Sequence, residues 1–88
     1  MTWTRESVQS ELHKLLGQHV QGGATIAGSS HLVADLGIDS LGVMEIVADI
    51  EDAFKLSIPD DALREVETVA DVAAAIEVRL QRDGRLQG

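Results

Sequence analysis

Apolar residues recur at helical spacing in three separate segments, and this repetition constrains the fold more than any other feature of the chain. The first segment predicts a helix over residues 4–20 with a stripe formed by Val8, Leu12, Leu15, Leu16 and His19. The second predicts a helix over residues 40–54 with a stripe formed by Val43, Ile46, Val47, Ile50 and Phe54. The third predicts a helix over residues 69–80 with a stripe formed by Val69, Val72, Ala73, Ile76 and Leu80. Each stripe must be buried against the others.

Helix-capping and helix-breaking residues set the limits of these segments. Residues of the kind that cap helix starts precede the three helices: Thr4, Asp39 and Thr68. Gly22 and Gly23 follow the first helix, and Pro59 prevents the second from continuing. Pro59 also favours the start of a short helix over residues 60–65. The predicted fold class is therefore all-α, a four-helix bundle with a long loop between helices one and two, a short third helix and a flexible tail over residues 82–88.

The long loop is rich in Gly and Ser, which predicts irregular backbone. It is not simply a linker, because five of its residues are apolar and need burial. These are Ile26, Leu32, Val33, Leu36 and Ile38. We expect the loop to pack across the bundle.

The size and charge of the chain narrow the classes of function. Its 88 residues suit a single domain over 1–88, expected to be a discrete monomer. No cysteine is present, so any thiol chemistry requires an attached group. No signal-like or membrane-spanning run occurs in the sequence, which predicts a cytoplasmic location and no membrane partner. Residues 33–77 contain 12 of the 15 acids and only two bases, a charge that repels nucleic acid and attracts basic protein surfaces.

Ser40 stands where the irregular loop meets the second helix. Free N–H groups and the helix dipole favour an anion at such a position, so a phosphodiester on the hydroxyl would be stabilised there. The alternative from the same residues is an ordinary N-cap, because Ser is a common capping residue.

The second helix has another face beside Ser40. Leu41, Met44 and Ala48 lie opposite the core stripe, with Glu45, Glu51 and Asp52 around them. An apolar centre with a charged rim is typical of a transient protein contact. The third helix could instead cover Leu41 and Met44, and we expect some burial with Met44 left accessible.

Three motifs now identify a family resemblance. The segment D-L-G-I-D-S-L at 35–41, with E-I-V-A-D-I-E-D-A-F at 45–54, resembles the phosphopantetheine attachment signature of acyl carrier proteins. L-S-I-P-D-D at 56–61 and T-V-A-D-V at 68–72 continue the similarity. The resemblance covers residues 5–80 as a pattern of helices and residues 32–72 as motif.

This resemblance implies a carrier that is not an enzyme, and it assigns roles to residues. Ser40 would carry 4'-phosphopantetheine, transferred from coenzyme A by a phosphopantetheinyl transferase, with Asp39 and Leu41 as its motif neighbours. The arm would hold acyl groups as thioesters for a ketosynthase, acyltransferase or acyl-activating enzyme with a basic patch. The implied partner-docking residues are Leu41, Met44, Glu45, Ala48, Glu51 and Asp52. The implied acyl-pocket residues are Val43, Val47, Ile58, Ala62 and Leu63.

One position departs from fatty-acid carriers, which commonly have an acid two residues after the serine. Gly42 occupies it here, the loop is rich in Ser and Gly, and the chain has only two lysines. These details favour polyketide or related secondary metabolism over a housekeeping fatty-acid carrier. A peptidyl carrier is a further alternative, although Asp39 before the serine favours the acyl type.

Other classes of function fit less well. A serine hydrolase requires G-x-S-x-G after a strand, and here Gly37 is one position too far from Ser40. A calcium loop fails because its third and twelfth positions, counted from Asp35, are Gly37 and Ile46. No zinc-like spacing occurs, so no catalytic residue or metal site is predicted. An acidic helical adaptor that binds partners without modification remains the alternative from another class.

Overall fold

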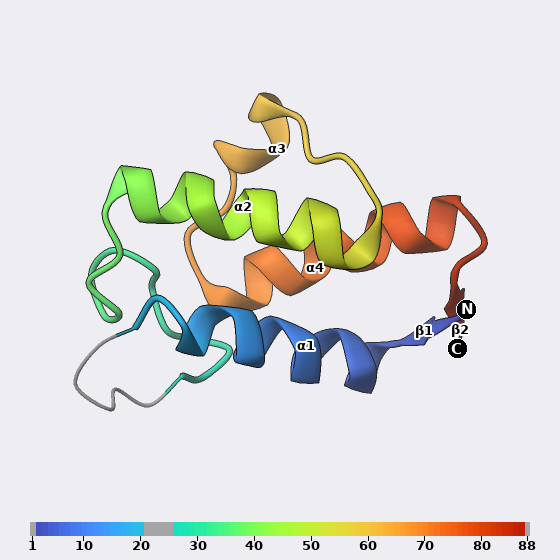
Figure 1. Ribbon diagram of the computed structural model, residues 1–88, viewed down its shortest axis with the longest axis horizontal. Helices are drawn as coiled ribbons and strands as arrows, with labels where there is room; N and C mark the ends of the chain where they lie inside the picture. The colour runs from blue at the N-terminus through green and yellow to red at the C-terminus, as the bar shows by residue number, and fades with distance from the viewer. Residues whose placement is uncertain (1, 21–25, 88) are drawn as a thin grey trace.

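The computed structural model describes residues 2–20 and 26–87, and these form four helices and two very short strands. α1 spans Arg5–Gly17, α2 Ser40–Phe54, α3 Asp60–Leu63 and α4 Val69–Arg82. α1, α2 and α4 run along the long axis of the molecule, and α3 lies on the outside (Figure 1). The predicted all-α four-helix bundle is confirmed.

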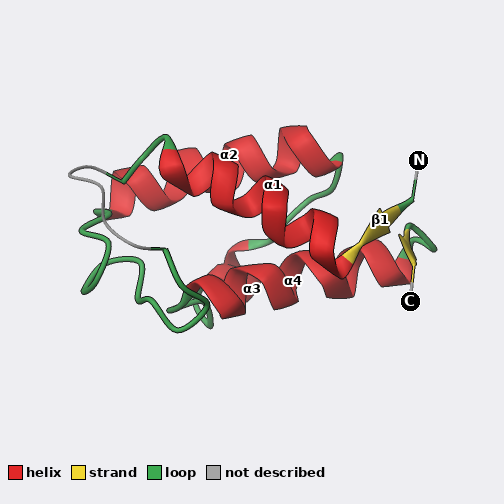
Figure 2. Cartoon of the chain, turned by 90° about the horizontal axis from the view of Figure 1, so that it is seen from below, coloured by secondary structure: helices red, strands yellow, loops and turns green. Residues whose placement is uncertain are grey.

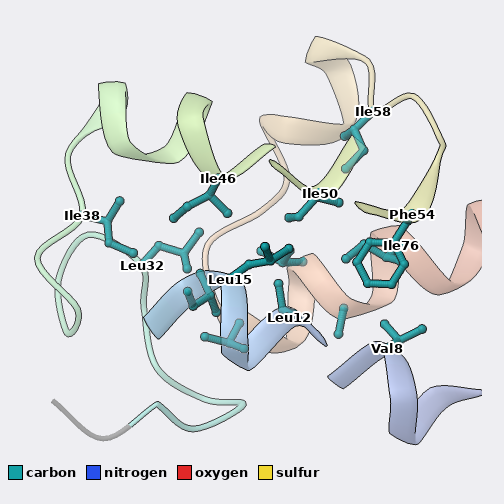
Figure 3. Close-up of a cluster of buried hydrophobic side chains, with 14 of the residues drawn as sticks. Val8, Leu12, Leu15, Leu32, Ile38, Ile46, Ile50, Phe54, Ile58 and Ile76 are labelled. Atoms are coloured by element: carbon teal, nitrogen blue, oxygen red, sulfur yellow. The ribbon is translucent and has the colours of Figure 1, made fainter. Parts of the chain in front are cut away.

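The three apolar stripes meet in one core between α1, α2 and α4 (Figure 3). Every apolar residue of the α1 and α4 stripes is buried. In α2, Ile46, Ile50 and Phe54 are buried, whereas Val43 and Val47 are partly buried at the edge of the core. None of the helices in the described part of the chain is long and apolar enough to cross a membrane.

The ends of α1 show how local sequence sets helix limits. Thr4 is the N-cap, as predicted, and exchanges hydrogen bonds with Ser7 in a capping box. The helix ends at Gly17, earlier than the predicted Val20, because Gln18 and His19 turn back to the carbonyls of Leu15 and Leu16 in a tighter i→i−3 pattern. Residues 22 and 23, predicted to end this helix, lie outside the described residues.

The other helices also differ slightly from the predicted limits. α3 stops at Leu63 rather than residue 65, because the Glu65 N–H donates to the Ala62 carbonyl in a tighter turn. α4 continues past Leu80 to Arg82. It ends where Gly84 adopts a positive φ of 69°, while the Arg85 N–H donates to the Leu80 carbonyl at 2.7 Å. This geometry is a Schellman C-cap.

The tail is predicted to be flexible over residues 82–88, and residues 85–87 of it form contacts with the bundle and with the start of the chain. β2 (Leu86–Gln87) pairs in parallel with β1 (Trp3–Thr4), which brings the two ends of the chain together (Figure 2). The Arg85 guanidinium donates to the Lys55 carbonyl at 2.8 Å and also to the Phe54 carbonyl. The physical reason is that the carbonyls at the end of α2 lack helical partners and accept from a nearby cation.

The long first loop packs against the bundle largely as expected. Leu32, Leu36 and Ile38 are buried and Ile26 is partly buried. Val33 contradicts the prediction, since it is 65% exposed. Backbone hydrogen bonds attach the loop to the start of α4: Leu32 N–H donates to the Glu67 carbonyl, and Val69 N–H donates to the Ser30 carbonyl, each at 3.0 Å.

Candidate functional site

A compact turn delivers the chain to the start of α2. The Asp35 carboxylate accepts from the His31 N–H at 2.8 Å, and Leu36 is buried behind it. Gly37 has a positive φ of 69°, a conformation that glycine adopts without strain. This reversal directs the buried Ile38 side chain into the core and leaves the next residues at the surface.

Asp39 and Ser40 have separate roles at the helix start. Asp39 is the N-cap of α2, because its carboxylate accepts from the Gly42 N–H at 2.7 Å. Ser40 is the first residue of the helix and is exposed. Its hydroxyl has no hydrogen bond to any residue that the structure describes, so capping does not occupy it. An exposed hydroxyl at a helix N-terminus is compatible with a phosphodiester, since the dipole and the first N–H groups favour an anion.

Gly42 is required by close packing rather than by backbone freedom. A Cβ at this position would lie 2.8 Å from Cγ2 of Ile38 and 3.3 Å from the Asp39 carboxylate. Ile38 is buried and cannot move away easily. The glycine therefore allows the incoming turn to lie tightly against the first turn of α2.

Beside Ser40, the predicted docking face is open. Leu41 and Met44 are each 67% exposed, and Ala48 is also exposed. α3 therefore does not cover them, and the partial burial that we expected is small. Leu41 also lines an open groove of about 550 Å³, with Asp39 and Glu45 along the same groove.

The acids of α2 differ from one another in their contacts. Glu45 and Asp52 are exposed, and Asp52 lies 3.6 Å from the Lys55 ammonium. Glu51 has a structural contact instead, because its carboxylate accepts from the Ile58 N–H at 2.8 Å and holds the chain after α2. A docking role for Glu51 remains a prediction, with one of its oxygens already engaged.

His19 and Asp49 belong to this surface, although the sequence analysis placed neither of them there. His19 was expected in the α1 core stripe, but its ring reaches across to α2, with Nε2 3.1 Å from Asp49 and Nδ1 3.8 Å from Glu45. The early end of α1 changes the direction of residue 19 and removes it from the stripe. The spacing of Glu45 and Asp49 at i, i+4 was the available signal, since such residues share one face.

The predicted acyl-pocket residues mostly come together. Val43, Val47, Ile58 and Leu63 line one apolar cavity between α2, α3 and α4, which Leu32, Ile46, Ile50, Val66, Val72 and Ala75 complete. Ala62 does not join them and lines a separate groove along α3 and α4. The volume of the cavity is about 20 Å³, room for about one water molecule. An acyl chain could enter only if side chains moved.

The start of α4 holds the loop that leads to Ser40. Thr68, the predicted N-cap, forms a capping box with Asp71, and Asp71 also accepts from the Glu67 N–H at 3.0 Å. The backbone N–H groups of Thr68 and Glu67 lower the pKa of Asp71 below its ordinary value near 3.8, because they favour the charged carboxylate. Leu32 pairs with this same segment through the Glu67 carbonyl.

The fold and site together define a small helical bundle with an exposed serine at a helix start. The family model described as phosphopantetheine attachment site matches residues 6–76, so the chain belongs to this family of phosphopantetheine-bearing carriers. It is 41% identical over 73 residues to an acyl carrier protein of an Exiguobacterium species, covering 83% of this chain and 89% of the relative. An acyl carrier protein of Exiguobacterium sibiricum is 50% identical over 46 residues, covering 52% and 58%.

A solved structure supports the same assignment. A protein from Mycobacterium tuberculosis assigned to the acyl carrier proteins superposes with a TM-score of 0.76 at 25% identity, covering 81% of this chain and 96% of that one. The chain therefore belongs to the acyl carrier protein family, whose members are carriers rather than enzymes, and its cofactor is covalently attached 4'-phosphopantetheine. Proteins of this kind work with a phosphopantetheinyl transferase and with acyl-handling enzymes.

Proposed function

We propose that Ser40 carries the phosphopantetheine arm and that the arm holds polyketide or related secondary-metabolite intermediates as thioesters. The observation that carries the assignment of Ser40 is the division of roles at the start of α2. Asp39 caps the helix, so the hydroxyl of Ser40 is exposed and free of hydrogen bonds to the described residues. The alternative that Ser40 is the N-cap loses its support, because Asp39 already caps the helix.

Modification at this site is a phosphoryl transfer. The Ser40 oxygen forms a bond to the phosphorus next to the pantetheine of coenzyme A, and the bond to the adenosine bisphosphate leaving group breaks. The hydroxyl proton passes to a base of the transferase or to water. When attached, the arm supplies the thiol that this cysteine-free chain lacks. The protein's own contribution is to present the oxygen at a fixed, accessible position.

We also propose that partners dock on the surface beside Ser40. Leu41, Met44 and Ala48 form its exposed apolar centre, and Glu45 and Asp52 present carboxylates at its rim. Such a surface fits a basic patch on the transferase, a ketosynthase or an acyltransferase. Binding should be weak and sensitive to salt, since the attraction depends on exposed charges. The cytoplasmic location and single-domain organisation stay predictions of the sequence.

Whether the bundle encloses its cargo would distinguish a carrier of long saturated chains from a carrier of polar intermediates. Its apolar cavity of about 20 Å³ is too small for an acyl chain without rearrangement, and the carbonyl oxygens of a polyketide would lose hydrogen bonds there. A housekeeping fatty-acid carrier would enclose its chain. Attachment of an octanoyl group should then shift the NMR signals of Val47, Ile58 and Leu63, whereas a carrier of polar cargo should leave them nearly unchanged.

The decisive experiment on Ser40 is an intact-mass measurement. The folded protein is incubated with coenzyme A and a broad-specificity phosphopantetheinyl transferase, alongside Ser40→Ala and the control Ser57→Ala. We expect one phosphopantetheinyl group on the parent protein and on the control, and none on Ser40→Ala. A mass gain that survives in Ser40→Ala would place the arm elsewhere. No gain on the parent with several transferases would favour the unmodified adaptor.

A further inference from the structure

The four carboxylates on α2 all have partners within the described part of the chain. Glu51 accepts from the Ile58 N–H, and Asp52 lies 3.6 Å from the Lys55 ammonium. The remaining two, Glu45 and Asp49, share His19. A basic partner that approaches α2 therefore meets carboxylates that already have contacts within the chain. His19 contacts two of these four carboxylates.

His19 is placed to interact with both acids at once. It follows the end of α1, and its side chain is only 18% exposed. Nε2 lies 3.1 Å from Asp49 and Nδ1 lies 3.8 Å from Glu45. One ring nitrogen is therefore within hydrogen-bond distance of Asp49, and the other faces Glu45.

The same histidine lies beside the modification site. His19 lines the open groove that also includes Asp39, Leu41 and Glu45, residues that flank Ser40 in sequence or lie one turn away from it. A protein that reaches the Ser40 hydroxyl from this side must cover the groove. Its lysine or arginine side chains would then compete with the imidazole for Glu45 and Asp49.

We propose that His19 is a specificity-determining residue of the docking surface, an internal partner that competes with the basic patch of another protein for Glu45 and Asp49. This inference rests on the proposed docking surface beside Ser40. Its consequence is a carrier whose attraction for each basic partner is lowered, which helps the carrier leave after each step. A change in the net charge of the chain would affect a partner similarly from any surface position. The proposed competition instead requires a side chain at position 19, because that residue contacts Glu45 and Asp49 together.

The test is the KM of a broad-specificity phosphopantetheinyl transferase for the full chain, at fixed coenzyme A and low salt. His19→Lys places a permanent cation beside the two acids and should raise KM about three- to tenfold. His19→Gln removes the imidazole that contacts both acids and should lower KM by about twofold. Both substitutions should change KM and leave kcat nearly constant, because they alter docking and not the phosphoryl transfer step. In an Asp49→Asn background, both effects should shrink.

Matched controls use His13, an exposed histidine on α1 that has no ion pair with any described residue. His13→Lys and His13→Gln make the same changes in net charge and should alter KM by less than about 1.5-fold. Equal effects at positions 13 and 19, or shifts in the same direction for His19→Lys and His19→Gln, would overturn the proposal. If the parent chain and both His19 variants are modified with the same KM, the role of His19 is overturned while the proposed function stands. No modification of the parent chain would remove the proposed function and this inference together.

Discussion

The two ends of α2 are built in opposite ways. At its C-terminal end, Phe54 is buried with its ring centroid 4.4 Å from that of Trp3, and Arg85 donates to the last carbonyls. At its N-terminal end, Ser40 and Leu41 are exposed beside an open groove. The closed end lies near the chain termini and the open end lies at the opposite side of the molecule (Figure 1).

This contrast separates stability from function along a single helix. The closed end joins residues from the first, middle and last parts of the chain, so it holds the helix by burial and hydrogen bonds. The open end contributes little burial and keeps its side chains available to other proteins. A carrier needs both properties, because partners must reach the serine while the helix stays in place.

The largest expected effect is the loss of stability at the closed end. Phe54→Ala should lower the free energy of unfolding by about 3–5 kcal/mol, because it removes a fully buried ring and leaves a cavity. Ser40→Ala at the open end should change the free energy of unfolding by less than about 0.5 kcal/mol. Urea unfolding followed by circular dichroism measures both. Phe54→Leu provides a milder variant if Phe54→Ala does not fold. Similar losses in the free energy of unfolding for the Phe54 and Ser40 variants would contradict the difference between the two ends of α2.

An intermediate effect should come from the tight turn beside Ser40. Gly42→Ala should gain about 0.5–1 kcal/mol in helix propensity but lose about 1–3 kcal/mol by overpacking against Ile38. The net result is a loss of about 0.5–2 kcal/mol in the free energy of unfolding. Gly17→Ala is the matched control, since a Cβ there would meet no atom within 4 Å, and it should stabilise the protein. Denaturant midpoints that move in the same direction for both variants would contradict this account of Gly42.

The smallest effect concerns the anchor of the loop that leads to the open end. Asp71→Asn should lower Tm slightly at pH 7 and speed hydrogen exchange at Leu32, because the start of α4 holds this loop. The pKa of Asp71 is lowered in the folded state, so its stabilisation is fully present above its ordinary value near 3.8 and is lost as the pH falls through the lower folded value.

The Tm difference between the parent and Asp71→Asn should therefore be constant near neutral pH and disappear on acidification below about pH 4. Thermal unfolding from pH 7 to pH 3 measures it. Asp61→Asn, which removes a carboxylate that is 94% exposed, controls for the change in net charge and should have a smaller effect. A Tm difference that grows as the pH falls would contradict the expected loss of the stabilisation by Asp71 on acidification.

The sequence predicted the features that depend on neighbouring residues. The helical stripes, the caps at Thr4, Asp39 and Thr68, and the position of Ser40 at a helix start all follow from spacing and residue type. Helix ends were less accurate, because the N–H groups of Gln18, His19 and Glu65 donate in a tighter i→i−3 pattern that periodicity does not reveal.

Features that depend on residues far apart in the chain were missed. Trp3 meets Phe54, and His19 reaches Asp49 across 30 residues. Val33 was expected inside because it is apolar, yet the turn around Gly37 leaves it at the surface. The sequence also did not reveal that the Glu51 carboxylate accepts from the Ile58 N–H, and a docking role for Glu51 stays a prediction.

The sequence by itself determined the helices, the core stripes and the place of the candidate modification serine, because these depend on interactions within a few residues. Only the tertiary structure decided which partner each acid of α2 contacts, which histidine faces two of these acids and which end of α2 is closed. The physical reason is that such contacts depend on how helices pack against one another and where each helix ends. If α1 continued in α-helical geometry through residue 19, the helical spacing would place His19 on the buried stripe instead of toward α2.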